Sequence, residues 1–588
     1  MGYEPVVKSA AERSAANLSD YRWACHDFTW RHARTWLPQQ PSGAGLNIAY
    51  QAVDRHARGE RADAVALRCL NQAGAGHDLT YAQLAEQTSR FANVLGGLGV
   101  KPGERVFCLL DRCPQLYVAA LGTLKYTAVL APLFCAFGRE PVRQRLAFGD
   151  AAVVVTTPEL YEERVAPVLP MLPALRHVLV TGEDVPAGTT SLERAMSGAG
   201  AGFEVPPTDP LSMALIHFTS GATGRPKGVV HVHEAVVAHH ATGRLALDLR
   251  PDDVFWCTAD PGWVTGTSYG IVAPLTVGAT VLVDEREYEA ERWYANLARH
   301  RVTVWYTAPS ELWMLMRHGG DLATRHDLSA LRHVASTGEP LNPEIVGWGL
   351  RALGRAVHDA WGQTETGAIM ISNFAGLDIR PGSMGLPVPG VEAALLRRGE
   401  DGRAAVRDGR VSPIEEPGAV GELALRAGWP SMFRGYLHDT AGYARCFAGG
   451  WYLSGDLARR DDDGYYWFVG RADDVIKSGG HLVGPFEVES QLMRHPAVAE
   501  AGVIGKPDPG AGSLVKAFVA LRPGHRPSTD LRRELLAFAR GRLGALAPQQ
   551  IDFAPDLPHT SNGKVLRRLL KARELGLPED DVSRPEAA

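Results

Sequence analysis

Residues 218–229 read Phe-Thr-Ser-Gly-Ala-Thr-Gly-Arg-Pro-Lys-Gly-Val and lie between two runs of strand-forming residues, 213–218 and 229–232. The apolar character of both runs predicts buried strands. Glycines let backbone N–H groups approach an anion closely, hydroxyl groups add donors, and Lys227 supplies a compact positive charge. The stretch therefore predicts a loop that holds phosphate, although a random cluster of Gly, Thr and Ser is more often an ordinary surface turn.

The loop differs from a Walker A loop, which requires Gly-x-x-x-x-Gly-Lys followed by Ser or Thr. Pro226 occupies the position of the glycine before Lys227, and Gly228 stands where the magnesium-binding hydroxyl would be. A phosphate site on this loop therefore belongs to another class of nucleotide-binding protein.

The length of 588 residues exceeds one ordinary hydrophobic core, so we expect at least two domains. The formal net charge of −5 is small, and no basic stripe with interleaved aromatic residues argues for nucleic-acid binding. The 7 cysteines are scattered without a Cys-x-x-Cys pair, which favours free thiols and a reducing, cytoplasmic compartment.

Neither a membrane span nor a secretory signal is expected from the sequence. The N-terminal residues are polar and mixed in charge, without the apolar core of a signal peptide. The longest nearly uncharged run, 269–283, is interrupted by glycine and proline and is shorter than the roughly 18 residues that a spanning helix needs.

Short Val- and Leu-rich runs alternate with helical patterns between residues 78 and 335, which predicts a mostly parallel sheet with helices on both faces. The helix pattern after Asp78 runs to Leu98. Residues 380–470 are rich in Gly and Pro with short strands, which predicts an antiparallel subdomain. We therefore expect an α/β protein with a large N-terminal domain, 1–470, of parallel and mixed sheets flanked by helices, and a small, mobile α+β C-terminal domain, 471–588. The C-terminal strands are expected at about 498–504 and 514–521, and its helices near 486–494 and 530–543.

Six further stretches combine glycine, hydroxyl and charged residues in ways that suit a ligand site; they lie at 256–269, 336–343, 359–367, 452–457, 470–489 and 560–568. Glu365 beside Thr364 supplies the hard oxygen ligands that Mg²⁺ prefers. Asp456 can accept hydroxyl groups from a ligand, and Lys564 lies on a Gly/Ser loop. Each feature also has an ordinary structural interpretation, namely a buried loop, a turn, a capping aspartate or a surface charge.

Together with 218–229, these stretches resemble the adenylate-forming superfamily of acyl-CoA synthetases, luciferases and peptide-synthetase adenylation domains. They occur in the order that the superfamily requires, between residues 218 and 568. The resemblance is closest to the branch of acetyl-CoA and medium-chain acyl-CoA synthetases. It implies an α/β body with a mobile C-terminal lid.

The resemblance also implies roles for individual residues. The phosphates of ATP would be bound by Thr219, Ser220, Gly221, Ala222, Thr223, Gly224 and Lys227. The adenine would stack on Gly338, Glu339 and Pro340, and the nucleotide would contact Asp359, Ala360, Trp361, Gly362 and Gln363. Thr364 would contact the α-phosphate, Glu365 would bind the metal, and Asp456 and Arg471 would bind the ribose.

Substrate and lid residues follow from the same resemblance. The acyl pocket would be lined by Trp263, Val264, Thr265, Thr337 and Gly362, and coenzyme A would pass Gly479, Gly480 and His481. The lid would turn about a hinge at Asp473. Lys564 would complete the catalytic set with Lys227, Thr364 and Glu365, and in relatives the equivalent lysine is a target of regulatory acylation. Glu487 and Glu489 are expected at the solvated start of a helix.

Two positions depart from the pattern of acetyl-CoA synthetases. Those enzymes carry Trp-Trp-Gln-Thr-Glu, whereas this chain has Gly362 after Trp361, as in medium-chain synthetases. Loss of an indole that buries about 200 Å² is expected to leave room for a longer or branched acyl chain, each CH₂ adding about 0.8 kcal/mol. The resemblance to medium-chain synthetases implies acids of roughly four to eight carbons. Leu482 replaces an arginine that binds ATP phosphates in relatives, so either His481 or Lys477 compensates or the adenylation half-reaction is slower.

The sequence therefore predicts an AMP-forming acyl-CoA synthetase that converts a carboxylic acid, Mg·ATP and coenzyme A to acyl-CoA, AMP and pyrophosphate through an acyl-adenylate. Short- or medium-chain acids larger than acetate are the first expectation. The alternatives are an acetyl- or propionyl-CoA synthetase, an adenylating enzyme that loads a carrier protein, and a catalytically weak nucleotide or acyl-CoA binder, which Leu482 would permit.

Overall fold

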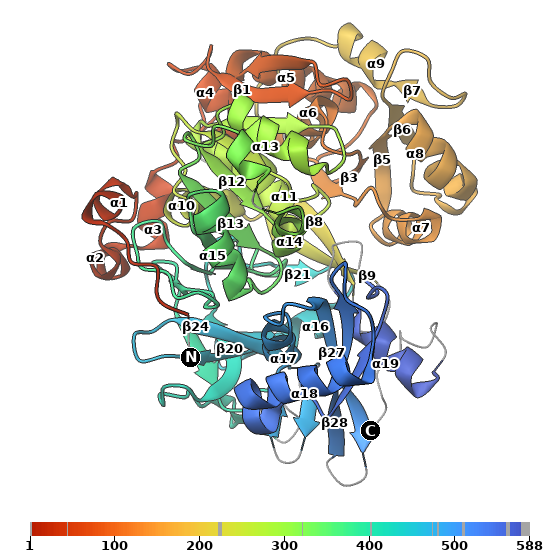
Figure 1. Cartoon of the computed structure of the whole chain (residues 1–588). Helices are drawn as coiled ribbons and strands as arrows, with labels where there is room; N and C mark the ends of the chain where they lie inside the picture. Colours follow the sequence, from red (N-terminus) through yellow and green to blue (C-terminus); the bar gives the residue numbers. More distant parts are fainter. Residues whose placement is uncertain are drawn as a thin grey trace.

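The computed structural model describes residues 3–43, 45–220, 226–319, 321–399, 403–472, 474, 476–478, 481–508, 512–559 and 565–577, with the backbone alone for Ser220, Lys477, His481, Leu482 and Gly512. Figure 1 shows a large body built from the red to green part of the chain and, below it, a smaller layer built from the cyan and blue part. The N-terminal end reaches this lower layer, where the Tyr3 ring contacts the Arg494 guanidinium at 4.5 Å.

The first sheet of the large body carries the expected phosphate loop. It has eight strands in the order β21-β9-β8-β4-β3-β5-β6-β7, and all pairs from β8 to β7 are parallel. Its strands are β3 (Arg105–Leu109), β4 (Val129–Pro132), β5 (Ala151–Thr156), β6 (His177–Val180), β7 (Thr190–Ser191), β8 (Met213–Ser220), β9 (Pro226–Val232) and β21 (Gly435–Tyr436). Strand β5 is buried along its whole length, as its continuous apolar run predicts.

The second sheet of the large body has nine strands in the order β16-β15-β14-β13-β12-β10-β11-β1-β2. Its central strands, from β14 to β1, are parallel. The strands are β1 (Val65–Leu70), β2 (Gly76–Thr80), β10 (Val254–Cys257), β11 (Thr280–Asp284), β12 (Val304–Thr307), β13 (His333–Thr337), β14 (Val357–Trp361), β15 (Ile371–Ser372) and β16 (Leu386–Pro387). The parallel strands of the large body therefore divide between two sheets, in agreement with the expected domain of parallel and mixed sheets.

Helices α5 (Tyr81–Gly97) and α6 (Pro114–Lys125) connect the two sheets: α5 packs on β1, α6 packs on β3 and β4, and the helices pack on each other. Helix α5 begins at a capping box of Thr80 and Gln83, two residues after the expected cap at Asp78, because 76–80 forms strand β2. The other α-helices of the body are α1 (Ala10–Ala15), α2 (Tyr21–Asp27), α3 (Trp30–Thr35), α4 (Arg55–Ala57), α7 (Arg139–Phe148), α8 (Pro158–Leu160), α9 (Leu192–Gly198), α10 (Ala235–Leu245), α11 (Val264–Thr267), α12 (Ala273–Val277), α13 (Ala290–Arg299), α14 (Pro309–Arg317) and α15 (Pro343–Ala352).

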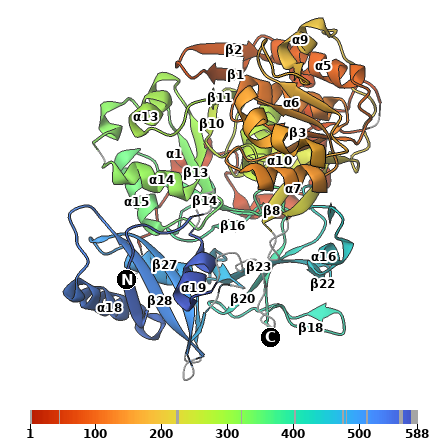
Figure 2. The same ribbon diagram turned by 90° about the vertical axis from the view of Figure 1, so that its right-hand side faces the viewer.

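Within the described residues, the lower layer contains two five-stranded sheets and one two-stranded sheet (Figure 2). The expected antiparallel subdomain is confirmed by β17 (Ala393–Leu396), β20 (Val420–Arg426), β23 (Trp451–Arg460), β22 (Phe447–Ala448) and β24 (Tyr466–Arg471), with the hairpin β18 (Val406–Arg407) and β19 (Arg410–Val411) and helix α16 (Thr440–Ala444). The smaller C-terminal unit has its own sheet, β26 (His481–Val483), β25 (Ile476–Ser478), β28 (Gly512–Leu521), β27 (Val498–Asp508) and β29 (Gln550–Phe553), and helices α17 (Pro485–Leu492), α18 (Thr529–Leu543) and α19 (Arg567–Leu575). The predicted fold class is confirmed.

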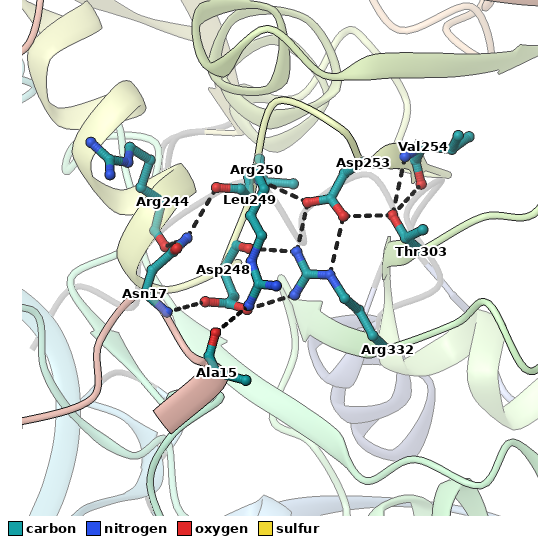
Figure 3. A network of polar contacts seen from close by, with 10 residues as sticks. All are labelled: Ala15, Asn17, Arg244, Asp248, Leu249, Arg250, Asp253, Val254, Thr303 and Arg332. Carbon is teal, nitrogen blue, oxygen red and sulfur yellow. Dashed lines mark hydrogen bonds and ion pairs between the residues drawn. The ribbon is translucent and has the colours of Figure 1, made fainter. Parts of the chain in front are cut away.

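An ion-pair network anchors the N-terminal segment to the second sheet (Figure 3). Arg332, just before β13, contacts Asp248 at 2.5 Å and Asp253 at 2.6 Å, and both carboxylate side chains are at most 4% exposed. Asp248 also accepts the backbone N–H of Asn17 at 2.6 Å and an N–H of Arg250 at 2.8 Å. One buried cluster therefore joins the segment between α1 and α2 to the amino-terminal ends of β10 and β13.

The cysteines and the apolar segments agree with the predictions from composition. All 7 cysteines are free thiols, and Cys69, Cys108 and Cys257 are buried as small apolar side chains. Over the part of the chain that the structure describes, no helix has both the length and the apolar character to cross a membrane.

Candidate active site

Strands β8 and β9 form an antiparallel hairpin in which Thr219 lies opposite Lys227. Both residues are half-buried at the tip of the hairpin. The predicted phosphate-binding residues Gly221, Ala222, Thr223 and Gly224 lie outside the described residues, and the Ser220 side chain is not described. The structure thus places two of the predicted phosphate ligands, on neighbouring strands.

Residues 359–361 end strand β14, and the predicted residues from Gly362 to Glu365 form a turn beyond it. The carboxyl end of a parallel strand is the usual place for a ligand site in an α/β sheet. The Thr366 hydroxyl accepts the Gln363 N–H at 2.8 Å and stabilises the turn. Burial raises the pKa of Asp359 to about 7, although backbone N–H groups of Leu341 and Ala360 bind the carboxylate.

Three of the predicted nucleotide-binding residues donate hydrogen bonds to the carboxylate of Asp456 on β23. One carboxylate oxygen accepts Trp361 Nε1–H and Gln363 Nε2–H, both at 2.9 Å, and the other accepts an Arg471 N–H at 2.6 Å. The Tyr452 hydroxyl donates to Gln363 Oε1 at 2.7 Å. A carboxylate has about four acceptor positions, so these three donors leave one for a ligand hydroxyl.

Two buried histidines that the sequence analysis missed support the turn at 364–367. His231 Nε2 lies 2.8 Å from the Thr364 carbonyl oxygen and its Nδ1 lies 3.1 Å from that of Ser431, while His239 Nε2 lies 3.0 Å from the Gly367 oxygen. Burial lowers the pKa of His231 to about 4 and that of His239 to about 3. Both rings are therefore neutral at pH 7, so each carries a single N–H: His239 donates it to the Gly367 carbonyl, and His231 donates it to one of its two neighbouring carbonyl oxygens.

Tyr436 is a second feature that sequence reasoning missed. Its hydroxyl donates to Glu365 Oε1 at 2.8 Å, and the Lys227 ammonium lies 4.8 Å from its ring centroid. Burial and the Glu365 carboxylate raise the pKa of Tyr436, which keeps the hydroxyl protonated as a donor. Only the Gly-Tyr pair at 435–436 marks this position in the sequence, and such a pair is common in turns.

The predicted acyl and adenine residues meet at the second sheet. Trp263 immediately precedes helix α11, which contains Val264 and Thr265. Its indole ring lies next to Gly338, where an added Cβ would be 3.4 Å from the ring. Gly338 has φ +95°, a conformation that suits glycine, at the turn after β13 that continues into Glu339 and Pro340. The structure thus brings together two of the predicted binding segments, 256–269 and 336–343.

The expected open space beside Gly362 is not present in the direction of a side chain. A Cβ at Gly362 would lie 2.7 Å from the carbonyl oxygen of Ala368 and 3.4 Å from the Thr366 hydroxyl. The Thr337 hydroxyl, on the neighbouring strand β13, donates to the Ala360 carbonyl at 2.8 Å. The Ala368 backbone thus occupies the space that the first atom of a side chain at Gly362 would need.

The predicted lid residues are only partly described. Asp473, Gly479, Gly480 and Lys564 lie outside the described residues, as does the side chain of His481. Glu489 is not at a solvated helix start: it is 3% exposed, and its carboxylate accepts two N–H groups of Arg567 at 2.9 and 2.6 Å. This pair ties α17 to the start of α19, directly after the predicted Lys564 loop.

Comparison with known sequences identifies the family. The family model described as AMP-binding enzyme matches residues 53–437, and the model described as AMP-binding enzyme C-terminal domain matches residues 487–564. The chain belongs to the AMP-binding enzyme family. The predicted adenylate-forming superfamily is therefore confirmed, and the enzyme is an AMP-forming acyl-CoA synthetase, an acid–thiol ligase.

The enzyme resembles relatives along nearly its whole length. It is 45% identical over 577 residues to an acetyl-coenzyme A synthetase of Bacillus subtilis (strain 168), covering 97% of this chain and 98% of that one. It also resembles the crystal structure of a Brucella canis acyl-CoA synthetase, with a TM-score of 0.72, 34% identity and coverage of 95% and 99%. An anthranilate CoA ligase in complex with anthranoyl-AMP gives a TM-score of 0.81 at 29% identity, with coverage of 91% and 98%.

Proposed function

We propose that the enzyme is an acetyl-CoA synthetase that converts acetate, ATP and coenzyme A to acetyl-CoA, AMP and pyrophosphate. The observation that carries this proposal is the 45% identity to the Bacillus subtilis acetyl-coenzyme A synthetase over almost the full length of both chains. The filled space beside Gly362 agrees with a small acid. Acetate thus replaces the larger acids as the first expectation.

In the first half-reaction, a carboxylate oxygen attacks the α-phosphorus of ATP and pyrophosphate leaves. Thr219 and Lys227 would bind the phosphates from the β8–β9 hairpin, and Lys564 would stabilise the charge that develops during attack. One acceptor position of Asp456 remains for a ribose hydroxyl, so recognition of both hydroxyls would require Arg471 to share or leave the carboxylate.

Mg²⁺ suits the chemistry of the turn after β14. Glu365 uses one carboxylate oxygen for Tyr436, which leaves the other as a hard oxygen ligand beside Thr364. Mg²⁺ bound there would neutralise phosphate charge. The residues present fit this ion because phosphate oxygens and water complete its usual coordination.

In the second half-reaction, the thiolate of coenzyme A attacks the acyl carbonyl carbon and AMP leaves. We propose domains at 1–470 and 471–588, with a hinge near Asp473 that removes Lys564 and presents the segment after Arg471. Glu489 and Arg567 would move together in this turn because their side chains form a buried ion pair.

The acid specificity can be tested by measuring CoA-thioester formation by the full-length enzyme with acetate, propionate, butyrate, hexanoate and benzoate. Acetate should give the highest kcat/KM. A preference for butyrate or longer acids would refute acetate as the substrate and restore the larger-acid interpretation of Gly362. Activity with a carrier protein but not with free coenzyme A would instead identify a carrier-loading enzyme, and ATP binding without turnover of any acid would identify a weak binder.

An aromatic acid is the second candidate, because the anthranilate CoA ligase has the highest TM-score among the neighbours described above, 0.81. Its identity of 29% is well below the 45% of the Bacillus subtilis relative. Benzoate in the same panel distinguishes the two candidates.

Gly362→Ala tests whether this glycine sets acyl length. The new Cβ would collide with the Ala368 carbonyl, and overpacking of about 1–3 kcal/mol corresponds to a roughly 5- to 150-fold loss in kcat/KM. We expect this loss with every acid of the panel. Gly541→Ala is the control, because a Cβ on that α18 residue has open space. A variant that merely shifts preference toward shorter acids would support an open pocket.

Asp456→Asn tests the nucleotide site. The amide keeps the shape of the carboxylate but turns an NH₂ group toward donors from Trp361, Gln363 or Arg471. Hydrogen bonds to charged groups contribute about 1.5–3 kcal/mol, so calorimetry should show ATP binding weakened by roughly 10- to 150-fold. Asp462→Asn, at an exposed aspartate beyond the same strand, is the control. Unchanged ATP affinity in Asp456→Asn would remove this residue from the proposed site.

A further inference from the structure

Tyr436 contacts the two oppositely charged side chains of the proposed phosphate and metal sites. Its hydroxyl donates to Glu365 Oε1 at 2.8 Å, and its ring faces the Lys227 ammonium at 4.8 Å from the centroid. Among the residues that the structure describes, no ion pair joins Lys227 to Glu365. Tyr436, which is 8% exposed, thus contacts both the Lys227 ammonium and the Glu365 carboxylate, and these two groups do not form an ion pair with each other.

The backbone fixes the position of this ring. Strand β21 pairs with β9, placing Tyr436 opposite Val229, and the Leu437 N–H donates to the Gly228 carbonyl at 2.7 Å. The Phe433 N–H donates to the Glu365 carbonyl at 3.0 Å. The segment 433–437 is therefore bonded both to the strand that carries Lys227 and to the turn that carries Glu365.

Further side chains hold the ring from the other side. The Phe433 ring lies 5.1 Å from that of Tyr436, and the Cys446 thiol approaches the tyrosine hydroxyl at 3.7 Å. The thiol also has the Gly442 carbonyl oxygen as an acceptor at 3.4 Å, and the tyrosine hydroxyl donates its own proton to Glu365 Oε1 at 2.8 Å. The ring has packed partners and a defined hydrogen bond, so its orientation is set before nucleotide arrives.

We propose that Tyr436 is a positioning residue that keeps Lys227 and Glu365 from neutralising each other and directs both toward the phosphates of ATP; this rests on the proposed function. The electron-rich face of the ring attracts the ammonium without replacing a phosphate. The hydroxyl binds one oxygen of Glu365 and leaves the other for Mg²⁺. Without the ring, a lysine and a glutamate on adjacent segments can pair directly and reduce the positive potential at the phosphate site.

Two substitutions separate these effects. Tyr436→Phe retains the ring over Lys227 and removes the bond to Glu365, whereas Tyr436→Leu removes both. Tyr443→Phe is the matched control: it removes a hydroxyl from the same aromatic cluster, where Tyr443 packs on Phe433 at 4.9 Å. The measurement is calorimetric binding of ATP to the full-length enzyme, with EDTA and with Mg²⁺, in the absence of acid and coenzyme A.

We expect Tyr436→Phe to keep the ATP affinity measured in EDTA and to lose about 10-fold or more of the affinity gained from Mg²⁺. Tyr436→Leu should weaken ATP binding under both conditions, and Tyr443→Phe should change neither. The proposal is overturned if Tyr436→Phe keeps the full Mg²⁺ gain, or if it loses the same factor with EDTA as with Mg²⁺. Circular dichroism verifies folding, and Tyr436→Phe alone decides the matter if Tyr436→Leu does not fold.

The outcomes distinguish this proposal from the proposed function. Wild-type enzyme that binds Mg·ATP but activates no acid refutes the function, while the comparison of variants still decides the role of Tyr436. Wild-type enzyme that forms acetyl-CoA, together with Tyr436 variants that bind Mg·ATP normally, refutes the positioning role alone.

Discussion

Lys564→Ala is expected to lower acetate-dependent pyrophosphate release by about 100-fold or more, because removing one group that stabilises transition-state charge typically costs 10²–10³ in rate. Thioester formation from supplied acetyl-adenylate and coenzyme A should stay close to the wild-type rate, since that step no longer develops charge at the α-phosphorus. Stopped-flow or quench measurements of each half-reaction separate the two effects.

Lys564 itself lies outside the described residues, but the structure describes the residues on either side of 560–564. His559 and Val565 form an antiparallel bridge, His559 Nε2 lies 2.7 Å from Glu500, and Arg567 pairs with Glu489. Lys101→Ala, at an exposed turn, is the control. Unchanged pyrophosphate release in Lys564→Ala would show that the lysine has another role, and equal loss in both half-reactions would indicate damage to the domain.

Arg332→Ala is expected to destabilise the large body by about 3–5 kcal/mol, the typical cost of leaving a buried ion-pair partner uncompensated. The substitution removes the contacts of Arg332 to Asp248 and Asp253, whose side chains are 3% and 4% exposed (Figure 3). Arg250 and the Thr303 hydroxyl would remain as partners, which limits the loss. The shift of the urea transition, followed by tryptophan fluorescence, measures the effect.

The control for Arg332→Ala is Arg68→Ala on β1. Arg68 pairs with Asp78 at 2.9 Å, but their side chains are 30% and 39% exposed, and exposed pairs contribute only about 0–1 kcal/mol. Equal effects of the two substitutions would mean that the network around Arg332 has no special importance for stability.

The sequence segments that form the candidate active site could be predicted because the residues that characterise each segment are close together in the sequence. The strand, turn and charged residues of 359–367 are adjacent in sequence, whereas Asp456 lies within strand β23 and Arg471 ends strand β24. The structure brings Trp361, Gln363, Asp456 and Arg471 into one hydrogen-bonded cluster. The resemblance to a family supplied the expectation that these distant strings meet.

Contacts that depend on strand order could not be predicted in this way. Tyr436 reaches Lys227 only because β21 joins the edge of the eight-stranded sheet beside β9, some 200 residues earlier in the chain. The assignment of each parallel strand to one of the two sheets could not be predicted for the same reason, since hydrophobic periodicity identifies strands without giving their neighbours.

Burial of polar groups was the other source of error. Glu489 follows a proline at a helix start, which favours solvent exposure, yet Arg567 from a later helix covers it. At Gly362 the missing side chain suggested an empty volume, but the Ala368 backbone occupies it. The size of a side chain can be read from the sequence, but the sequence does not show whether the backbone of another segment occupies the space beside it.

The most direct test of the central claim follows oxygen from acetate labelled with ¹⁸O in both carboxylate positions. If the enzyme activates acetate as an adenylate, coenzyme A displaces AMP at the acyl carbon, and mass spectrometry should find one ¹⁸O in each AMP formed with acetyl-CoA. Unlabelled AMP, or label in orthophosphate, would contradict the adenylate mechanism.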